Sequence, residues 1–565
     1  MLLLSATTIA LTLLLRYAWL VVRYRQARDK KDENQVPPAY PAYLPWVGNI
    51  VSVAWDIRSF IHRTTHYNGV PTAAKVSILG YPFYVFQDRE SISKIMRHPC
   101  LSSPMSLYVF GQRILFDMPE KGVAAYIADD SGPSAKPFPG SQVPPAKRVD
   151  YLLHKAFNQA WTGTPLSSTS RRFMKILSTE VNSLEISDEW MEIDDFFKFF
   201  GKALSNSVTE SIFGPALLQL NPNIIEDAWE FDEVLPWLFR CIPSCLYRHP
   251  HMLRKRLSKQ ILRWYAYARQ WFTDDSIYSD GDGDPFWGSG IIRQLQRELL
   301  KSGEKGFIDD ECFAAHDMGL IWGSNSNVIA AAMLAACHVF QDRTLLERVR
   351  CEVDSSFPRP FSLENVDHKQ LFQLPLLSSI YSEILRLYVD VMLVFSSPHV
   401  DVRLGKWCLP KGEKALISTS IAHKDDSIWN TYHRQHPLDS FWAERFIVDP
   451  ADPYSGPLRP ELKVIEKYSE GKKPYYSSQG LDGVWIPFGG GPSMCPGRFL
   501  AKAIVMSTCA LLVSRFDIEV LASSIETSPL RFGLGVSKPA RPIGARVKAR
   551  QQDDKFYPSD RVLSE

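Results

Sequence analysis

The sequence lacks any paired-cysteine motif and any strong excess of charge of one sign. Its nine cysteines are scattered, and no two of them form a Cys-x-x-Cys pair. An odd number at irregular spacing argues against a disulfide framework, and the missing pairs exclude zinc-ribbon and thioredoxin-type sites. Lysine and arginine number 64 against 62 acidic residues. No overall basic field therefore attracts nucleic acid, and we expect no nucleic-acid partner.

The sequence also contains no internal repeat, no phosphate loop and no dinucleotide-binding motif. Of its 565 residues, 45% are hydrophobic and 22% are charged, which is an ordinary globular composition. Helical patterns dominate, so we expect a mainly α-helical fold with small β-sheets. The predicted helices are 148–161, 187–213, 225–240, 250–272, 309–342, 343–354, 375–389 and 497–514, and the predicted strands lie near 73–86, 391–409 and 414–418.

The first 22 residues are almost entirely apolar, with Arg16 as the one charged residue among them. About 20 helical residues span a bilayer, and five basic residues follow this run within positions 23–31. We expect residues 1–22 to be an uncleaved transmembrane anchor; a cleaved signal peptide is the less favoured alternative. We expect residues 23–49 to form a basic and proline-rich linker and residues 50–565 to form one large domain on the cytoplasmic side.

A glycine-rich loop near the C-terminus presents a single cysteine, Cys495, directly before a predicted helix. Backbone N–H groups and the positive end of a helix stabilise a thiolate. A lone thiolate suits the axial position on haem iron, and Gly489 and Gly491 allow the backbone to pass close to a flat macrocycle. Phe488 stands seven residues before the cysteine, where its ring can pack beside the sulfur.

This stretch resembles the haem-binding signature of the cytochrome P450 family, Phe-x-x-Gly-x-x-x-Cys-x-Gly. The resemblance implies the cytochrome P450 fold and a haem b whose iron is axially ligated by Cys495. It also implies that Phe488, Gly489, Gly491 and Arg498 belong to the cofactor-binding loop.

Two further motifs stand in the order that this family shows. Glu383 and Arg386 share one helix face at positions i and i+3. In the family, such a pair binds an arginine from a later Phe-x-x-Glu-Arg-Phe segment, which here supplies Arg445. The resemblance thus implies a buried charge triad that fixes the fold around the cysteine loop.

The long helix over residues 309–342 departs from the family pattern. Most members carry an acid and an alcohol in its middle, whereas this sequence has Ser326 and Asn327 there. This region resembles the sterol 7α-hydroxylase and prostacyclin synthase group, as does the stretch after Arg531. An asparagine donates and accepts hydrogen bonds but supplies no acidic proton. We take Asn327 and Ser326 as the candidate catalytic residues; an alternative is that Asn327 only satisfies a backbone group.

Histidines are the candidate partners for the haem propionates. On the helix over 148–161, His154 is one candidate and Lys155 another, although a solvated face is an equally valid interpretation of both. After the Glu-x-x-Arg helix, His399 stands where the family has a basic residue. An ordinary core histidine is the alternative interpretation of His399.

The resemblance implies a monooxygenase at the endoplasmic reticulum membrane that acts on a lipophilic substrate such as a sterol, a terpenoid or another specialised metabolite. Because the chain has no dinucleotide motif, electrons are expected from a separate NADPH-cytochrome P450 reductase. Two other functions stay open. One is an oxygen-independent isomerase or dehydratase of the prostacyclin synthase type, and the other is a haem protein without catalysis.

Overall fold

The computed structural model describes residues 2–29, 35–42, 44, 46–67, 70–271, 283–303, 309–463 and 473–551. Parts of the predicted linker, including Lys30, Lys31, Tyr43 and Pro45, lie outside the described residues. The last residues of the predicted catalytic domain, 552–565, lie outside them as well.

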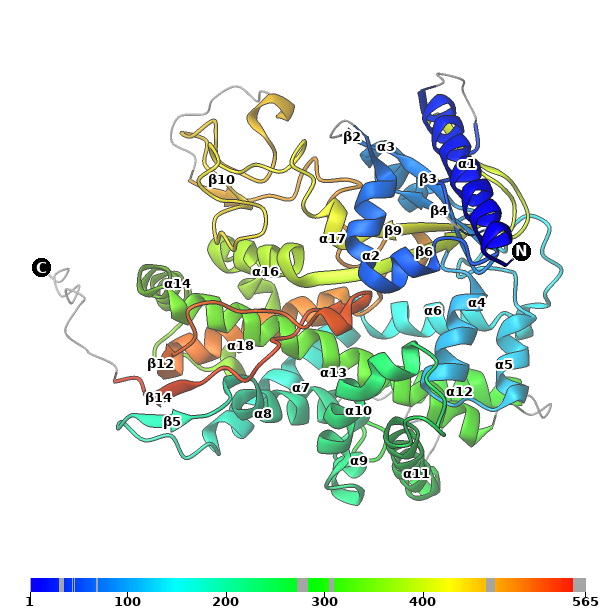
Figure 1. The fold of residues 1–565 in the computed structure, drawn as a ribbon. Coiled ribbons are helices and arrows are strands. Elements are labelled where there is room, and N and C mark those ends of the chain that lie inside the picture. Colours follow the sequence, from blue (N-terminus) through cyan, green and yellow to red (C-terminus); the bar gives the residue numbers. More distant parts are fainter. Residues whose placement is uncertain are drawn as a thin grey trace, which may run out of the picture.

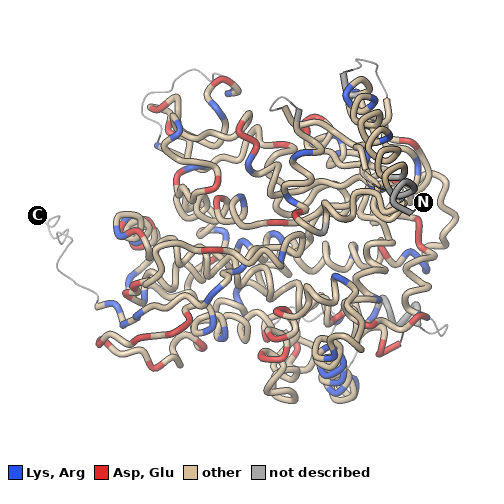
Figure 2. The backbone as a smooth tube through the Cα atoms, viewed as in Figure 1, with Lys and Arg blue, Asp and Glu red and all other residues tan. Residues whose placement is uncertain are grey.

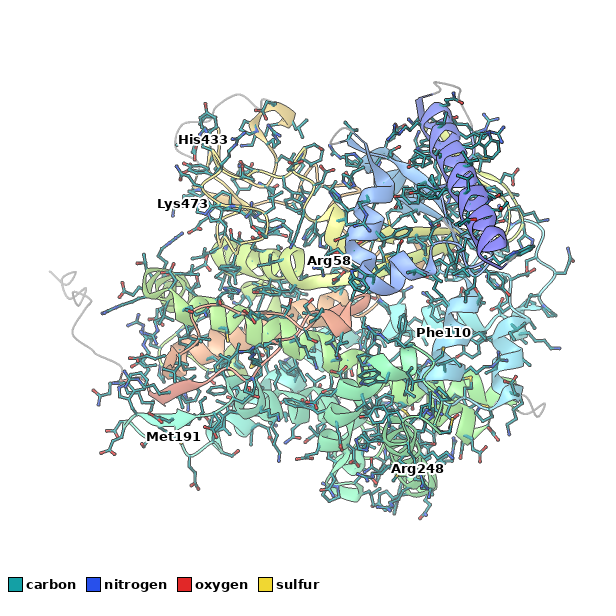
Figure 3. The ribbon with its side chains drawn as sticks, viewed as in Figure 1. Arg58, Phe110, Met191, Arg248, His433 and Lys473 are labelled. Atoms are coloured by element: carbon teal, nitrogen blue, oxygen red, sulfur yellow. The ribbon has the colours of Figure 1, made fainter. Side chains whose placement is uncertain are left out.

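Helices make up most of the described chain, as the sequence predicts (Figure 1). The long helix α13 (Asp310–Gln341) runs through the middle, and α8 (Phe196–Phe213) and α18 (Arg498–Arg515) pack against it. Side chains fill the space between these layers (Figure 3). The remaining α-helices are α1 (Leu2–Asp29), α2 (Ile50–Thr65), α3 (Arg89–Arg97), α4 (Met105–Phe110), α5 (Glu120–Ile127), α6 (Val149–Ala160), α7 (Gly163–Asn182), α9 (Pro215–Leu220), α10 (Ile224–Phe239), α11 (His249–Ala268), α12 (Gly290–Gly303), α14 (Arg343–Ser356), α15 (His368–Leu371), α16 (Pro375–Tyr388) and α17 (Thr419–Ala422).

The ends of α13 follow from local sequence. The side chain of Asp309 accepts a hydrogen bond from the backbone N–H of Cys312 at 3.2 Å, which caps the first turn. The first turn also contains two acidic residues, whose negative charges interact favourably with the positive end of the helix dipole. At the other end, Asp342 leaves the helical conformation and caps α14, accepting from the N–H of Leu345 at 3.0 Å. The boundaries of α13 therefore differ by only one residue from the predicted 309–342.

The sheets are small and lie at the edges of the helical body (Figure 1). The largest has the order β13-β6-β9-β4-β3, in which β4 and β9 are parallel and the other pairs are antiparallel. Its strands are β3 (Ala73–Ile78), β4 (Tyr81–Phe86), β6 (Val389–Ser396), β9 (Lys414–Ser418) and β13 (Leu534–Val536). The smaller sheets contain β1 (His66–Tyr67), β2 (Val70–Pro71), β5 (Met191–Ile193), β7 (Val402–Leu404), β8 (Trp407–Leu409), β10 (Ile447–Val448), β11 (Tyr475–Tyr476), β12 (Phe516–Val520) and β14 (Ala545–Ala549).

Two expectations from the sequence are wrong in detail. The predicted helix 187–213 begins only at residue 196, because Asp195 caps it there and the preceding residues form β5. The predicted strand 73–86 is a hairpin, since Leu79 and Gly80 turn the chain with positive φ angles. The sequence analysis also missed α7, a 20-residue helix that packs against α8.

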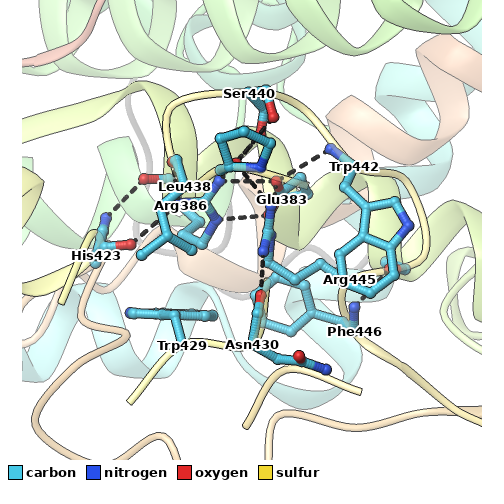
Figure 4. A network of polar contacts seen from close by, with 12 residues as sticks. Glu383, Arg386, His423, Trp429, Asn430, Leu438, Ser440, Trp442, Arg445 and Phe446 are labelled. Atoms are coloured by element: carbon cyan, nitrogen blue, oxygen red, sulfur yellow. Dashed lines mark hydrogen bonds and ion pairs between the residues drawn. The ribbon is translucent and has the colours of Figure 1, made fainter. Parts of the chain in front are cut away.

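A buried charge triad ties α16 to the segment that follows β9 (Figure 4). Arg386 donates to both carboxylate oxygens of Glu383, at 2.7 and 2.8 Å, and Nε of Arg445 lies 3.0 Å from each of them. All three side chains are fully buried. Burial alone would raise the pKa of Glu383, but the two guanidinium groups hold it below its usual value. Removing one partner of such a buried group lowers the free energy of unfolding by about 3–5 kcal/mol. The triad predicted from the resemblance is confirmed.

The helix α1 covers the predicted anchor and continues to Asp29, but no membrane span is shown there. Among the described residues, α13 is the one helix whose length and hydropathy suit a membrane span, and most of it is buried inside the protein. The C-terminal end of α1 is attached to the body, since the Tyr24 hydroxyl donates to the carbonyl of Thr64 at 2.8 Å. A transmembrane role for α1 stays a prediction.

Candidate active site

A cavity of about 520 Å³ lies between α13 and the N-terminal half of α18. Its wall is mainly apolar, which is usual for a site that takes a lipophilic ligand. Polar side chains also line the cavity. Those used below are Gln112, Asp150, His154, Trp161, His316, Asn327 and Cys495.

The loop before α18 brings Cys495 to this cavity. The backbone N–H of Cys495 donates to the carbonyl of Phe488 at 3.0 Å, which closes the loop into a compact turn. Gly489 and Gly491 have φ angles of 70° and 64°, a region that favours glycine. At Gly490 a Cβ atom would lie 2.2 Å from Sδ of Met96, so the loop can pack against α3 only without a side chain there.

The exposed surface of Cys495 faces the cavity and not the bulk solvent, because protein surrounds the residue on its other sides. Burial raises the pKa of its thiol, while the backbone N–H of Gly497 and the charge of Arg498 act in the opposite direction. These two groups favour the thiolate, which is the form of cysteine that binds a metal ion.

The residues present fit a haem better than a bare metal ion. No group of three or more His, Cys, Asp or Glu side chains that could hold a metal is found among the described residues. One cysteine therefore needs a metal that brings its other ligands, as haem iron does. In the same cavity, Nε1 of Trp161 is buried without a hydrogen-bond partner among the described residues, which suits a ligand with polar groups.

Two of the predicted loop residues do not line the cavity. Arg498 donates from Nη1 to the carbonyl of Cys495 at 3.0 Å and packs over the ring of Phe499. Gly491 packs against the backbone carbonyl of Met96. The two residues thus shape the cysteine loop from behind, whereas Phe488 and Gly489 do line the cavity.

The cysteine loop is hydrogen-bonded to the charge triad through His423, a residue that the sequence analysis missed. Nδ1 of His423 donates to the carbonyl of Arg386 at 3.1 Å. Its Nε2 accepts from the backbone N–H of Ile486 at 3.1 Å, two residues before Phe488. Burial first, and then the charge of Arg386, lowers the pKa of His423 to about 3. The neutral ring therefore joins the triad to the loop.

His154 lies on α6 and lines the cavity. Its Nδ1 lies 3.0 Å from a carboxylate oxygen of Asp150 and 2.9 Å from the carbonyl of the same residue. Burial would lower the pKa of His154, but Asp150 raises it above the usual value. His399, in contrast, binds Asp130 on a loop and is not among the residues that line the cavity, so the expectation for His399 is wrong.

Asn327 lies on the cavity side of α13. Its Oδ1 accepts from the backbone N–H of Val536 in β13 at 2.9 Å, which leaves the two amide protons of Nδ2 as donors. Gly535 makes this contact possible, because a Cβ atom there would lie 2.0 Å from Oδ1. Strand β13 thus sets the orientation of the Asn327 side chain.

Ser326 faces away from this cavity, which corrects the prediction that it stands beside Asn327 in the site. Its hydroxyl donates to Asp232 of α10 at 2.8 Å and accepts from Arg531 at 2.9 Å. Lys538 binds the same carboxylate, and together these cations hold the pKa of Asp232 far below its usual value although burial acts against them. Trp322 also donates to Asp232, at 2.7 Å. A separate cavity of about 240 Å³ is lined by Asp232, Trp322, Ser326 and Lys538.

Comparisons with known proteins agree with this geometry. The sequence model of the family described as Cytochrome P450 matches residues 199–546. The chain is 30% identical over 563 residues to cytochrome P450 monooxygenase efuG of Hormonema carpetanum, covering 97% of this chain and 96% of that protein. It is 27% identical over 560 residues to cytochrome P450 monooxygenase fsoE of Humicola fuscoatra, covering 94% and 91%.

A more distant relative is cholesterol 7-alpha-monooxygenase of Cricetulus griseus. It is 24% identical over 420 residues, which cover 70% of this chain and 75% of that protein. The overall similarity to sterol 7α-hydroxylases is therefore confirmed.

We predict that His423→Asn makes stability less dependent on pH. In the wild type, the pKa of His423 is about 3 when folded against 6.5 when unfolded. The unfolded chain thus binds a proton first as the pH falls below 6.5, and the free energy of unfolding drops by about 1.4 kcal/mol per pH unit. Urea unfolding at about pH 7 and about pH 5 measures this loss, which is smaller in the variant.

The matched control is His433→Asn, because His433 is exposed at the surface (Figure 3). Its pH dependence is expected to equal that of the wild type. An equal pH dependence in His423→Asn would contradict the neutral, buried state of that ring.

Proposed function

The chain belongs to the cytochrome P450 family, and we propose that it inserts one oxygen atom of dioxygen into a lipophilic substrate. As a member of this family it is an oxidoreductase that uses haem with a cysteine-ligated iron. The balanced reaction takes substrate, dioxygen, NADPH and a proton to hydroxylated substrate, NADP⁺ and water. The observation that carries the proposal is the position of Cys495, which opens on an apolar cavity closed on the opposite side by α13.

Cys495 is proposed as the axial ligand of the iron. Bound haem would supply the oxygen-activating chemistry, and the protein supplies its position and surroundings. Phe488 and Gly489 line the cavity beside the sulfur, and Gly491 and Arg498 hold the loop. Asp150 raises the pKa of His154, and a protonated His154 ring would suit a carboxylate at the edge of the cofactor.

Asn327 is proposed as the polar group of the reacting end of the cavity. Since its Oδ1 is bound by the N–H of Val536, its amide protons are the groups available to a water molecule or to a substrate oxygen. Ser326 is proposed as a support for this position, because its hydrogen bonds hold the adjacent turn of α13 to Asp232.

A second candidate function is an oxygen-independent isomerase or dehydratase. It is favoured by Asn327 itself, since no carboxylic acid is next to it on the cavity face of the described α13. Such an enzyme would convert its substrate without NADPH.

We propose that α1 anchors the protein in the endoplasmic reticulum membrane, with the catalytic domain in the cytoplasm and a separate NADPH reductase as electron donor. Most of α1 is uncharged, and basic residues gather near its end away from the N-terminus (Figure 2). Large apolar side chains are exposed along it, which suits a lipid environment. They are Leu11, Leu14, Leu15, Trp19 and Val22.

Deletion of residues 1–29 is expected to release the protein from membranes, because it removes the proposed anchor. Sedimentation of carbonate-washed membranes measures this, and retention of the shortened chain in the pellet would contradict a single anchor. Full-length protein with Leu246→Asp, an exposed position outside α1, is the control that is expected to stay in the pellet.

Microsomes that contain the protein and a reductase are expected to consume NADPH and dioxygen in step with formation of an oxygenated product. Cys495→Ala is expected to abolish this consumption, because no other described residue offers a thiolate to the cavity. Cys312→Ala, a buried thiol outside the cavity, is the matched control and is expected to retain activity. Product formed by the wild type without NADPH would favour the isomerase instead.

A further inference from the structure

One face of α13 borders the cavity along three helical turns. The lining residues from this helix recur at helical spacing and include His316, Leu320, Ser324, Asn327 and Val328. His316 and Asn327 are 11 residues apart, so their backbones are separated by about 16 Å at ~1.5 Å per residue. Both polar residues thus lie on the same face, at opposite ends of a longer, mainly apolar wall.

His316 offers a hydrogen-bond acceptor at its end of the cavity. Its Nδ1 lies 3.2 Å from Oδ1 of Asp317 and must carry the proton, because a carboxylate only accepts. Asp317 is held in turn by the hydroxyl of Tyr265, which donates to its other oxygen at 2.5 Å. In the neutral ring with this tautomer, Nε2 is an acceptor, and no described group forms a hydrogen bond to it.

Gln112 brings a second acceptor to the same end. It belongs to the π-helix η1 (Gly111–Leu115), and its Oε1 is buried with no partner among the described residues. Phe116 follows η1 directly and lies 3.0 Å from the position of a Cβ atom on Gly319, one turn after His316. The segment with Gln112 therefore lies beside the part of α13 that carries His316.

The space between the two polar ends is open. A Cβ atom added to Gly323 would meet no other atom within 4 Å, so the middle of the helix face leaves room for a ligand. The buried Oε1 of Gln112 lacks a donor, and a ligand that brings a donor to it gains affinity. A hydroxyl can donate to Oε1 of Gln112 or to Nε2 of His316, whereas an ionised carboxylate can donate to neither.

We propose that the substrate is an elongated, mainly apolar molecule with a hydroxyl group at the end remote from the oxidised carbon, and that His316 and Gln112 bind this hydroxyl. Asp317 acts as a positioning residue that fixes the tautomer of His316. The inference rests on the proposed function for the direction of the substrate, since the oxidised end must face Cys495 and Asn327.

Equilibrium dialysis of the purified holoenzyme tests the inference without requiring turnover. The probes are three alcohols, each compared with the hydrocarbon that lacks the hydroxyl: cholesterol and cholestene, lupeol and lupene, and hexadecanol and hexadecane. The wild type is expected to bind at least one alcohol about tenfold or more tightly than its hydrocarbon. His316→Leu is expected to remove this preference by weakening the alcohol and leaving the hydrocarbon unchanged.

The matched control is His338→Leu. His338 is also a histidine of α13, but it binds the hydroxyl of Tyr388 at 2.7 Å and does not line the cavity. This variant is expected to keep the preference for the alcohol. Gln112→Leu is the second test variant, which serves if His316→Leu does not fold, and it is expected to reduce the preference as well.

The inference is overturned if the wild type binds no alcohol more tightly than its hydrocarbon, or if both His316→Leu and Gln112→Leu keep the preference. Because dialysis reports binding alone, these outcomes are distinct from a failure of oxygenation. If the wild type shows the preference but makes no oxygenated product, the hydroxyl-binding role of His316 and Gln112 stands and the proposed function is wrong.

Discussion

The ion pairs of Glu383 with Arg386 and Arg445 are the contact on which the site depends most. All three charged side chains are fully buried. Each charge therefore needs partners inside the protein, which restricts where the three side chains can lie. Their remaining donors bind backbone carbonyls of the segment after β9, including those of Leu438 and Asn430 (Figure 4). A long stretch of irregular chain is thereby fixed against α16 without regular secondary structure of its own.

A short series of hydrogen bonds connects this triad to the loop that carries Cys495. His423 joins the carbonyl of Arg386 to the N–H of Ile486, and the loop then closes where Cys495 donates to Phe488. On the other side of the cavity, the segment over residues 531–536, which includes β13, orients the residues of α13. It binds Asn327 through Val536 and holds the neighbouring turn of α13 through Arg531. Two distant parts of the chain thus determine the two walls of one cavity.

The sequence predicted the parts of this arrangement that are local. The glycine loop before α18, the Glu-x-x-Arg pair and the limits of α13 depend on neighbouring residues, and all are found as expected. The roles of His423, Asp232 and Gln112 depend on contacts between segments far apart. Ser326 shows the reason most clearly. It is adjacent to Asn327 in the sequence but lies on the opposite face of α13. There it binds Arg531, which is 205 residues away in the sequence. No local pattern contains that information.

The central claim is that oxygen from dioxygen enters a lipophilic substrate at this cavity. The most direct measurement is mass spectrometry of the product formed under oxygen-18 gas in ordinary water, with NADPH and a reductase present. The account predicts a product that carries a single labelled oxygen atom in the wild type and no product with Cys495→Ala. A product without label, formed equally well in the absence of dioxygen, would contradict it.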